Sequence, residues 1–217
     1  MEGRMMKWLK WLMPLGMIGV IVYFIHVFLG QILWAGYNPI TTDISSLTAT
    51  GAPNAGLLRI FTTIYGICFL AFAIGMVLKA WKDYHAVTKV GYIVFLIMAF
   101  TTTVGYAMFP LTGDKTVMNF QNMMHIIVTV IVVFTTISSF YLLAFGYLKK
   151  EKLKTLGRIG LVVAILITLF GAMNPIGMAT NLNILGLTER LVIFPLQAFV
   201  FFLSFIYTFN CKILSQK

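Results

Sequence analysis

The fold of this chain is decided by residues 118–175, which read MNFQNMMHIIVTVIVVFTTISSFYLLAFGYLKKEKLKTLGRIGLVVAILITLFGAMNP. Two apolar stretches, 118–147 and 157–175, flank a short connection that is rich in lysine. Because a helix rises about 1.5 Å per residue, each stretch is long enough to cross a hydrocarbon layer roughly 30 Å thick. The segment therefore predicts two membrane-spanning helices joined by a basic turn.

The same pattern extends over the rest of the chain, where further apolar stretches lie at about 11–34, 56–79, 90–109 and 187–209. The 217 residues are 60% hydrophobic and only 10% charged, with a mean hydropathy of +0.94, and this composition excludes a soluble domain of this size. We therefore predict an all-α polytopic membrane protein. Residues 1–217 are expected to form a single membrane domain, a six-transmembrane-helix bundle.

The positive charges fall almost entirely on alternate connections. Of the 16 lysines and arginines, all but Arg59, Lys115 and Arg190 lie on one face of the membrane if the N-terminus is cytoplasmic. Short loops with an excess of lysine and arginine stay in the cytoplasm, so the N- and C-termini are both predicted to be cytoplasmic. The residues on that face are Arg4, Lys7, Lys10, Lys79, Lys82, Lys89, Lys149, Lys150, Lys152, Lys154, Arg158, Lys212 and Lys217.

The membrane itself accounts for the net charge of +10, because anionic headgroups of the cytoplasmic leaflet attract basic residues beside membrane spans. We therefore expect membrane lipids as partners and no nucleic acid. The short Lys-rich loops are typical of a multi-pass protein of a prokaryotic plasma membrane. The first apolar stretch is expected to be a retained span, because it is longer than the apolar region of a cleaved signal.

One connection is long. The exoplasmic loop 35–55 lacks the apolar length to cross a membrane, and Gly, Pro and Asn mark turns at both of its ends. Within it, Asp43 to Leu47 offers a cap followed by a short amphipathic turn. We expect this loop to pack over the outer mouth of the bundle, either as a functional lid or as a structural plug.

Polar side chains within or beside the spans converge on the exoplasmic leaflet. Because polar groups in lipid are costly unless they face a partner or a cavity, the convergence predicts a pocket. Asn122 and His125 can share one helix face, and Arg190 is suited to an anionic group. Interhelical hydrogen bonding is the alternative for His26 and His125. The candidate ligand-binding residues are Asp43, Ser45, Asn122, His125, Glu189, Arg190 and His26.

Motifs for catalysis or metal binding are absent from the sequence. There is no His-Glu-x-x-His pattern, no paired cysteines and no nucleophile elbow, so catalytic residues remain unassigned and no metal and no cofactor is expected. No disulfide is expected between Cys68 and Cys211, because Cys68 lies inside the second span and Cys211 at the cytoplasmic end of the sixth. Glu189 is interpreted as an acid favoured at the start of a helix.

Several of these motifs resemble the domain-of-unknown-function family 998. They are Asp43 to Ala49 with Gly51 to Ala55 after the first span, Phe109-Pro110 before a loop, His125 in the fourth span, and Gly186 to Arg190 opening the sixth. The family comprises six-span prokaryotic membrane proteins that are loosely similar to the Frag/DRAM/Sfk-like group. The resemblance covers nearly the whole chain and implies a family without an established activity, with a lipid-related role suggested only through distant relatives.

Two classes of function follow from the residues. The first is a membrane protein that binds a lipid headgroup or small polar ligand in an exoplasmic-side pocket, with His125 and Arg190 as contacts. The alternatives are an intramembrane lipid hydrolase or transferase that uses His125 with Asp43 or Glu189, and a small-molecule transporter. Whether the protein is an enzyme is left open at this stage, and its oligomeric state is not predicted. Under the first hypothesis Asp43, His125 and Arg190 share one water-accessible site.

Overall fold

The computed structural model describes residues 2–113, 117, 119–180 and 182–211. Lys115, Met118, Lys212 and Lys217, to which loop, span or terminal positions are assigned above, lie outside the described residues. The elements are α1 (Glu2–Leu33), the 3-10 turn η1 (Ser45–Thr48), α2 (Ala55–Asp83), α3 (Ala86–Phe100), the π-helical turn η2 (Thr101–Gly105), α4 (Tyr106–Met108), α5 (Phe120–Phe145), the π-helical turn η3 (Gly146–Lys150), α6 (Lys154–Ala179) and α7 (Leu185–Thr208).

The prediction of an all-α bundle with six long apolar helices is confirmed. The helices long and apolar enough to cross a membrane are Trp8–Leu33, Ala55–Asp83, Ala86–Met108, Phe120–Lys150, Lys154–Gly177 and Leu185–Thr208. Large apolar side chains such as Ile67, Phe134 and Leu169 are exposed on the outside of the bundle, where a membrane protein contacts lipid. The chain is therefore a multi-pass membrane protein.

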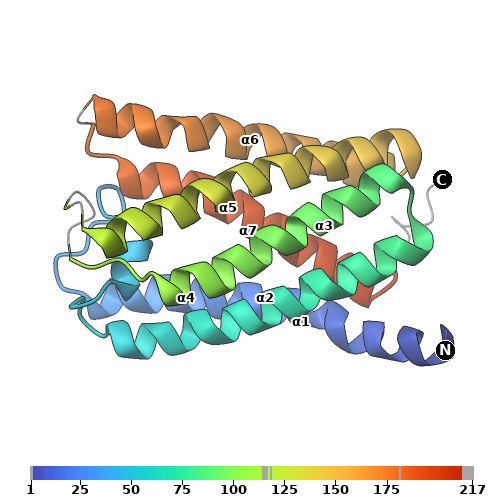
Figure 1. Cartoon of the computed structure of the whole chain (residues 1–217), viewed down its shortest axis with the longest axis horizontal. Coiled ribbons are helices and arrows are strands. Elements are labelled where there is room, and N and C mark those ends of the chain that lie inside the picture. The colour runs from blue at the N-terminus through green and yellow to red at the C-terminus, as the bar shows by residue number, and fades with distance from the viewer. Residues whose placement is uncertain (1, 114–116, 118, 181, 212–217) are drawn as a thin grey trace.

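The spans form a closed ring in chain order, in which each long helix packs on the next and α7 returns to α1. Their axes run lengthwise through the molecule, and α1 begins where α7 ends (Figure 1). We call this the terminal end. The opposite end carries the long connection 34–54 and the start of α2, and we call it the loop end.

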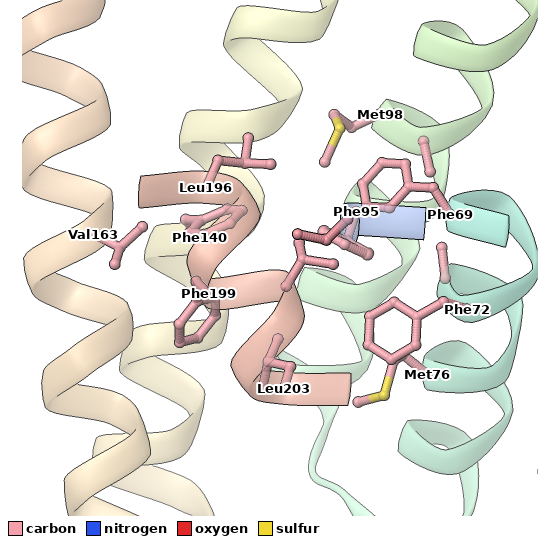
Figure 2. Packing of buried hydrophobic residues seen from close by; sticks show 14 of the residues in the cluster. Phe69, Phe72, Met76, Phe95, Met98, Phe140, Val163, Leu196, Phe199 and Leu203 are labelled. Carbon is pink, nitrogen blue, oxygen red and sulfur yellow. The ribbon is translucent and has the colours of Figure 1, made fainter. Parts of the chain in front are cut away.

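Aromatic side chains fill the centre of the ring. Phe69, Phe95, Phe140 and Phe199 form a row from α2 through α3 and α5 to α7, with ring centroids 5.4, 6.5 and 5.3 Å apart in turn. Figure 2 shows these rings facing one another together with Leu196 and Leu203 of α7. All four phenylalanines are buried, so the row forms a dry core that packs α2, α3, α5 and α7 against one another.

A polar side chain of α7 also enters the backbone ladder of α1. The Ser204 hydroxyl accepts a hydrogen bond from Met17 N at 2.8 Å and donates to the carbonyl of Met13. It thus stands between the two groups that an uninterrupted helix would join directly, one residue away from Pro14. Since the hydroxyl satisfies both backbone groups, the irregularity in α1 carries no unpaired polar atom there.

The terminal end is held by a polar network. Four buried or half-buried phenols form a hydroxyl chain in which Tyr207 Oη lies 2.6 Å from Tyr84 Oη and 3.0 Å from Tyr147 Oη, and Tyr147 also bonds Tyr92. These hydroxyls link α3, η3 and α7 to one another and, through Tyr84, to the end of α2. Each phenol brings its hydroxyl into contact with another, so their burial does not leave the oxygens without partners.

Glu151 closes the connection beside this chain. Its carboxylate accepts hydrogen bonds from Thr88 Oγ1 at 2.6 Å and from His85 N at 2.9 Å, and it lies 3.1 Å from His85 Nδ1. Burial by itself would raise the pKa of the Glu151 carboxyl, but these hydrogen bonds outweigh it and hold that pKa below its ordinary value. The carboxylate therefore joins the start of α3 to the end of η3.

The predicted orientation, with both termini in the cytoplasm, can be measured with reporter fusions. Reporter fusions at Lys82 and Glu151 should read cytoplasmic, whereas fusions at Asn54, Thr112 and Asn183 should read exoplasmic, because basic residues are concentrated at the terminal end. A reporter pair such as alkaline phosphatase and green fluorescent protein gives opposite signals on the two sides. A reproducible exoplasmic signal at Lys82 or Glu151 would refute the assignment of the termini.

Candidate functional site

A cavity of about 390 Å³ lies inside the bundle towards the loop end. Its walls come from α1, α2, α5, α7 and the end of the third span, and η1 contributes to its roof. This size is within the range of small-molecule sites, roughly 300 to 1,000 Å³. The cavity lining includes several of the polar residues that the sequence places at this end of the spans, among them His26, His125 and Glu189.

One wall is a cluster of aromatic and amide side chains from three helices. The ring of Tyr23 lies 5.6 Å from that of His26 on the same helix and 4.8 Å from that of Tyr65 on α2. Tyr65 in turn accepts a hydrogen bond from Gln197 Nε2 at 2.7 Å. Gln197 lies about 18 Å along α7 from Leu185 by helical rise, so this wall reaches deep into the span.

Two side chains in this wall have polar atoms without a hydrogen-bond partner among the described residues. They are His26, through both Nδ1 and Nε2, and Gln197, through Oε1. Each residue is only 2% exposed, and each lines the cavity. A buried polar atom without a partner is destabilising by roughly 1 to 3 kcal/mol, so these atoms require either water or a ligand in the cavity.

A second part of the cavity lining is shaped by the π-helical turn η2. Thr102 and Thr103 of this turn line the cavity, and Thr103 Oγ1 donates to Ala99 O at 2.8 Å and to Gly66 O at 3.2 Å. A π-helical turn adds a residue to one turn of a helix and is frequent at functional sites. Here the turn shifts the register of the third span just before Tyr106, another lining residue.

His125 completes this wall from α5. Its ring lies 4.9 Å from the ring of Tyr106, and its Nδ1 lies 2.8 Å from the carbonyl oxygen of Phe109. The Tyr106 hydroxyl donates to Thr129 Oγ1 at 3.2 Å. His125 therefore lines the cavity and at the same time holds the chain where the third span ends.

The roof is held by Asp43 and Glu189. Both carboxylate oxygens of Asp43 accept hydrogen bonds from hydroxyls of the following turn, one from Ser45 at 2.6 Å and the other from Ser46. Glu189, at the start of α7, accepts a hydrogen bond from the backbone N–H of Ile44. Asp43 thus holds the start of η1 through two serine hydroxyls, and Glu189 holds Ile44, the residue before the turn. Glu189 and Ser45 also line the cavity beneath η1.

Arg190 joins the long loop to α7. Its Nη1 contacts the carbonyl oxygens of Pro39 at 2.8 Å, Thr42 at 3.1 Å and Gly186 at 2.8 Å, and its Nη2 donates to the Tyr37 hydroxyl at 2.7 Å. Burial raises the pKa of Tyr37 to about 12, although the hydrogen bond from Arg190 favours the phenolate. The guanidinium is buried under the loop and does not line the cavity.

The structure divides the sequence-predicted site residues into two groups. His26, Ser45, His125 and Glu189 line the cavity. Asp43, Asn122 and Arg190 do not line it and instead hold two of the connections at the loop end.

Asn122 holds the connection between the third and fourth spans. Its Oδ1 accepts from Thr112 N at 2.8 Å and from Thr112 Oγ1 at 2.9 Å, and its Nδ2 donates to the carbonyl oxygens of Thr112 and Val117. Asn119 Oδ1 caps α5 by accepting from Asn122 N at 2.8 Å. The polar run at the start of this span therefore closes a turn.

Arg59, Tyr65 and Gln197 line the cavity but are not among the predicted site residues. Arg59 donates its Nε to Thr48 O at 3.0 Å and its Nη2 to Thr50 Oγ1 at 3.1 Å, so it faces the roof. The sequence does mark Gln197, because it is an amide in the middle of an apolar stretch and follows Pro195 closely. Tyr65 carries no such mark, since aromatic residues are common throughout the spans.

Two lining residues place an opening of the cavity. Thr63 on α2 and Ala107 on α4 are exposed although they line the cavity, so the cavity reaches the surface between these two elements. Both residues belong to membrane spans. The opening therefore faces the lipid-exposed side of the bundle near the loop end. Among the described residues, no three His, Cys, Asp or Glu side chains are grouped so that they could hold a metal ion.

Comparison with curated proteins gave no match, and comparison with solved structures gave none. A protein-family model does match, and it covers residues 17–206, which include almost all of the six spans and the whole cavity wall. This match confirms the family resemblance of the loop and helix-start motifs. The chain therefore belongs to the DUF998 family, which is described as a family of proteins of unknown function.

Proposed function

We propose that this protein binds the headgroup of a membrane lipid, or another small polar molecule, in the cavity at the loop end of the bundle. The observation that carries the proposal is the deep wall, where His26 and Gln197 present polar atoms that have no partner among the described residues. A site for a ligand supplies those partners. In the predicted orientation the cavity lies in the exoplasmic half of the membrane.

The opening between α2 and α4 favours a lipid as the source of the headgroup. Thr63 and Ala107 belong to helices long and apolar enough to cross the membrane, so we expect a molecule that enters there to come from the bilayer. The lining also includes apolar side chains such as Phe69, Met98 and Leu196, which can contact a hydrocarbon chain. A polar deep wall with an apolar approach is the arrangement expected for an amphiphile.

The proposal is one of binding. The hydrolase hypothesis pairs His125 with Asp43 or Glu189, but the Asp43 carboxylate accepts hydrogen bonds from Ser45 and Ser46 and does not line the cavity. His125 Nδ1 faces the carbonyl of Phe109, and Glu189 accepts from the backbone of Ile44. These contacts give each of the three side chains a role in holding the loops at this end of the bundle.

The proposal is tested by blocking the opening. Wild-type protein purified in mild detergent should retain a small amphiphile that native mass spectrometry detects, and Ala107→Trp should lose most of it because the added ring fills the approach to the cavity. Val130→Trp is the matched control, since Val130 is exposed on α5 and does not line the cavity. Equal retention by the wild type, Ala107→Trp and Val130→Trp would contradict the proposed site.

A further inference from the structure

Resting on the proposed function, we infer that the group bound at the deep wall is an uncharged, hydroxyl-bearing headgroup of the glycerol type. His26 and Gln197 would recognise it through hydrogen bonds. The chemical class is an acylglycerol with at least two free hydroxyl groups, and free glycerol carries the same head without the acyl chain.

The first step is the inventory of hydrogen bonds at the deep wall. A neutral imidazole offers one donor and one acceptor, and both nitrogens of His26 lack a partner among the described residues. Gln197 uses its Nε2 for Tyr65, which leaves the acceptor Oε1. The atoms of the wall that lack a partner thus amount to two acceptors and one donor. Two hydroxyl groups on adjacent carbons can donate to both acceptors and accept from the donor.

The second step is proximity. His26 and Gln197 come from α1 and α7, but the rings of Tyr23 and Tyr65 connect them in one continuous cluster. Tyr23 lies between His26 and Tyr65, with ring centroids 5.6 and 4.8 Å away, and Tyr65 bonds Gln197 directly. All four side chains line the same cavity, so one small headgroup can reach both polar residues.

The third step concerns charge. An anionic group deep in a span needs a cation beside it, but the Arg190 guanidinium lies outside the cavity lining and contacts Pro39, Thr42 and Gly186 carbonyls. Arg59 faces the roof through Thr48 and Thr50. The acid in the lining, Glu189, would repel a phosphate or carboxylate.

A cationic head is disfavoured for a related reason. The atoms without partners at the deep wall belong to an imidazole and an amide, which carry no negative charge, and Glu189 already accepts a hydrogen bond from Ile44. A buried ammonium group would lose its hydration without gaining an ion pair at His26 and Gln197. The hydrogen-bonding and charge observations therefore agree on a neutral head.

The test compares heads on one acyl chain. Delipidated protein is titrated with 1-monoolein, oleic acid, oleylamine and free glycerol, and binding is followed by thermal shift and by native mass spectrometry. We expect monoolein to bind at least about tenfold more tightly than oleic acid or oleylamine, which corresponds to the loss of one or two hydrogen bonds. Saturation by free glycerol at comparable concentration would identify a free polyol as the source.

Variants assign the recognition to the deep wall. His26→Phe and Gln197→Met should each weaken monoolein binding about tenfold or more, with oleic acid binding little changed. His26→Phe should also leave the unfolding midpoint of the ligand-free protein unchanged or raised, because it removes two buried nitrogens that have no partner among the described residues. His85→Phe, at the terminal end, is the matched control and should bind monoolein like the wild type.

Some outcomes would overturn the inference and leave the proposed function intact. Equal affinity for monoolein, oleic acid and oleylamine would show that the cavity binds the acyl chain without recognising the headgroup. Unchanged monoolein preference in both His26→Phe and Gln197→Met would place recognition elsewhere. By contrast, failure of every amphiphile to bind, together with equal retention by Ala107→Trp and the wild type, would contradict the proposed function itself. Water alone would then satisfy the deep wall.

Discussion

Substitution of Gly186 by alanine is expected to detach the long loop from α7 and to destabilise the protein by about 3 kcal/mol, the upper part of the usual range for overpacking. A Cβ atom at this position would lie 2.6 Å from the carbonyl oxygen of Pro39 and closer still to that of Thr42. Both obstacles are backbone atoms, so a rotamer change cannot relieve the contact. The N–H of Leu187 also donates to Ile40 O at 2.9 Å, and this bond would be lost with the loop.

The measurement is the unfolding midpoint in detergent micelles together with limited proteolysis of residues 34–54. Gly186→Ala should lower the midpoint and make the loop susceptible to cleavage. Gly56→Ala serves as the control, because nothing lies within 4 Å of a Cβ placed there and Gly56 stands at the start of α2. Alanine should be neutral or slightly stabilising at Gly56. Wild-type behaviour of Gly186→Ala in both assays would refute the close packing of this joint.

Removal of the Arg190 side chain should have the other large effect. Arg190→Ala leaves the carbonyls of Pro39, Thr42 and Gly186 without their charged donor and removes the bond to Tyr37. Hydrogen bonds to charged groups contribute about 1.5 to 3 kcal/mol each, and such groups do not add fully, so we expect a loss of roughly 3 to 5 kcal/mol. Arg190→Lys should lie between, because an ammonium cannot reproduce the planar fork.

This expectation separates two roles for Arg190. If the guanidinium fixes the loop, Arg190→Ala lowers the unfolding midpoint and exposes the loop to protease whether or not a ligand is present. If instead it contacts the ligand, as the sequence suggests, the ligand-free protein keeps its midpoint and only ligand retention falls. Arg59→Ala is a useful comparison, because Arg59 is half-buried and, among the described residues, donates to Thr48 and Thr50, so its loss should be milder.

The sequence predicts the spans well because each one is a long apolar run with polar boundaries. In lipid such a run forms an α-helix, since a helix satisfies its backbone hydrogen bonds within a single segment. The predicted boundaries differ from the structure mainly where basic residues continue a helix beyond the apolar run. The helix α1 begins at Glu2, well before the predicted position 11, and α2 runs to Asp83 beyond the predicted position 79. Charged residues at helix ends can reach the membrane surface, so hydropathy underestimates helix length there.

The candidate site is predicted less completely, and the reason is the kind of partner that each residue finds. Placement by depth correctly brings His26 and His125 to one cavity although they are far apart in sequence. Placement by depth cannot decide whether Arg190 contacts a ligand or holds the loop. The partners of Arg190 are backbone carbonyls of the folded loop, and the sequence does not reveal that these carbonyls lie beside it. Gln197 is overlooked because a single amide lacks the charge that attracts notice, yet its depth makes it the more costly group to leave unpaired.

The row of phenylalanines described above closes the cavity on the side that faces the terminal end. Phe69, Phe95, Phe140 and Phe199 close the middle of the ring between the cavity and the terminal end, and each is at most 2% exposed. Under the proposed function, a molecule that enters between Thr63 and Ala107 would leave by the same opening, so its lifetime in the cavity would depend on how often that opening releases it. The occupancy of the cavity would then follow the concentration of that molecule in the leaflet that the opening faces.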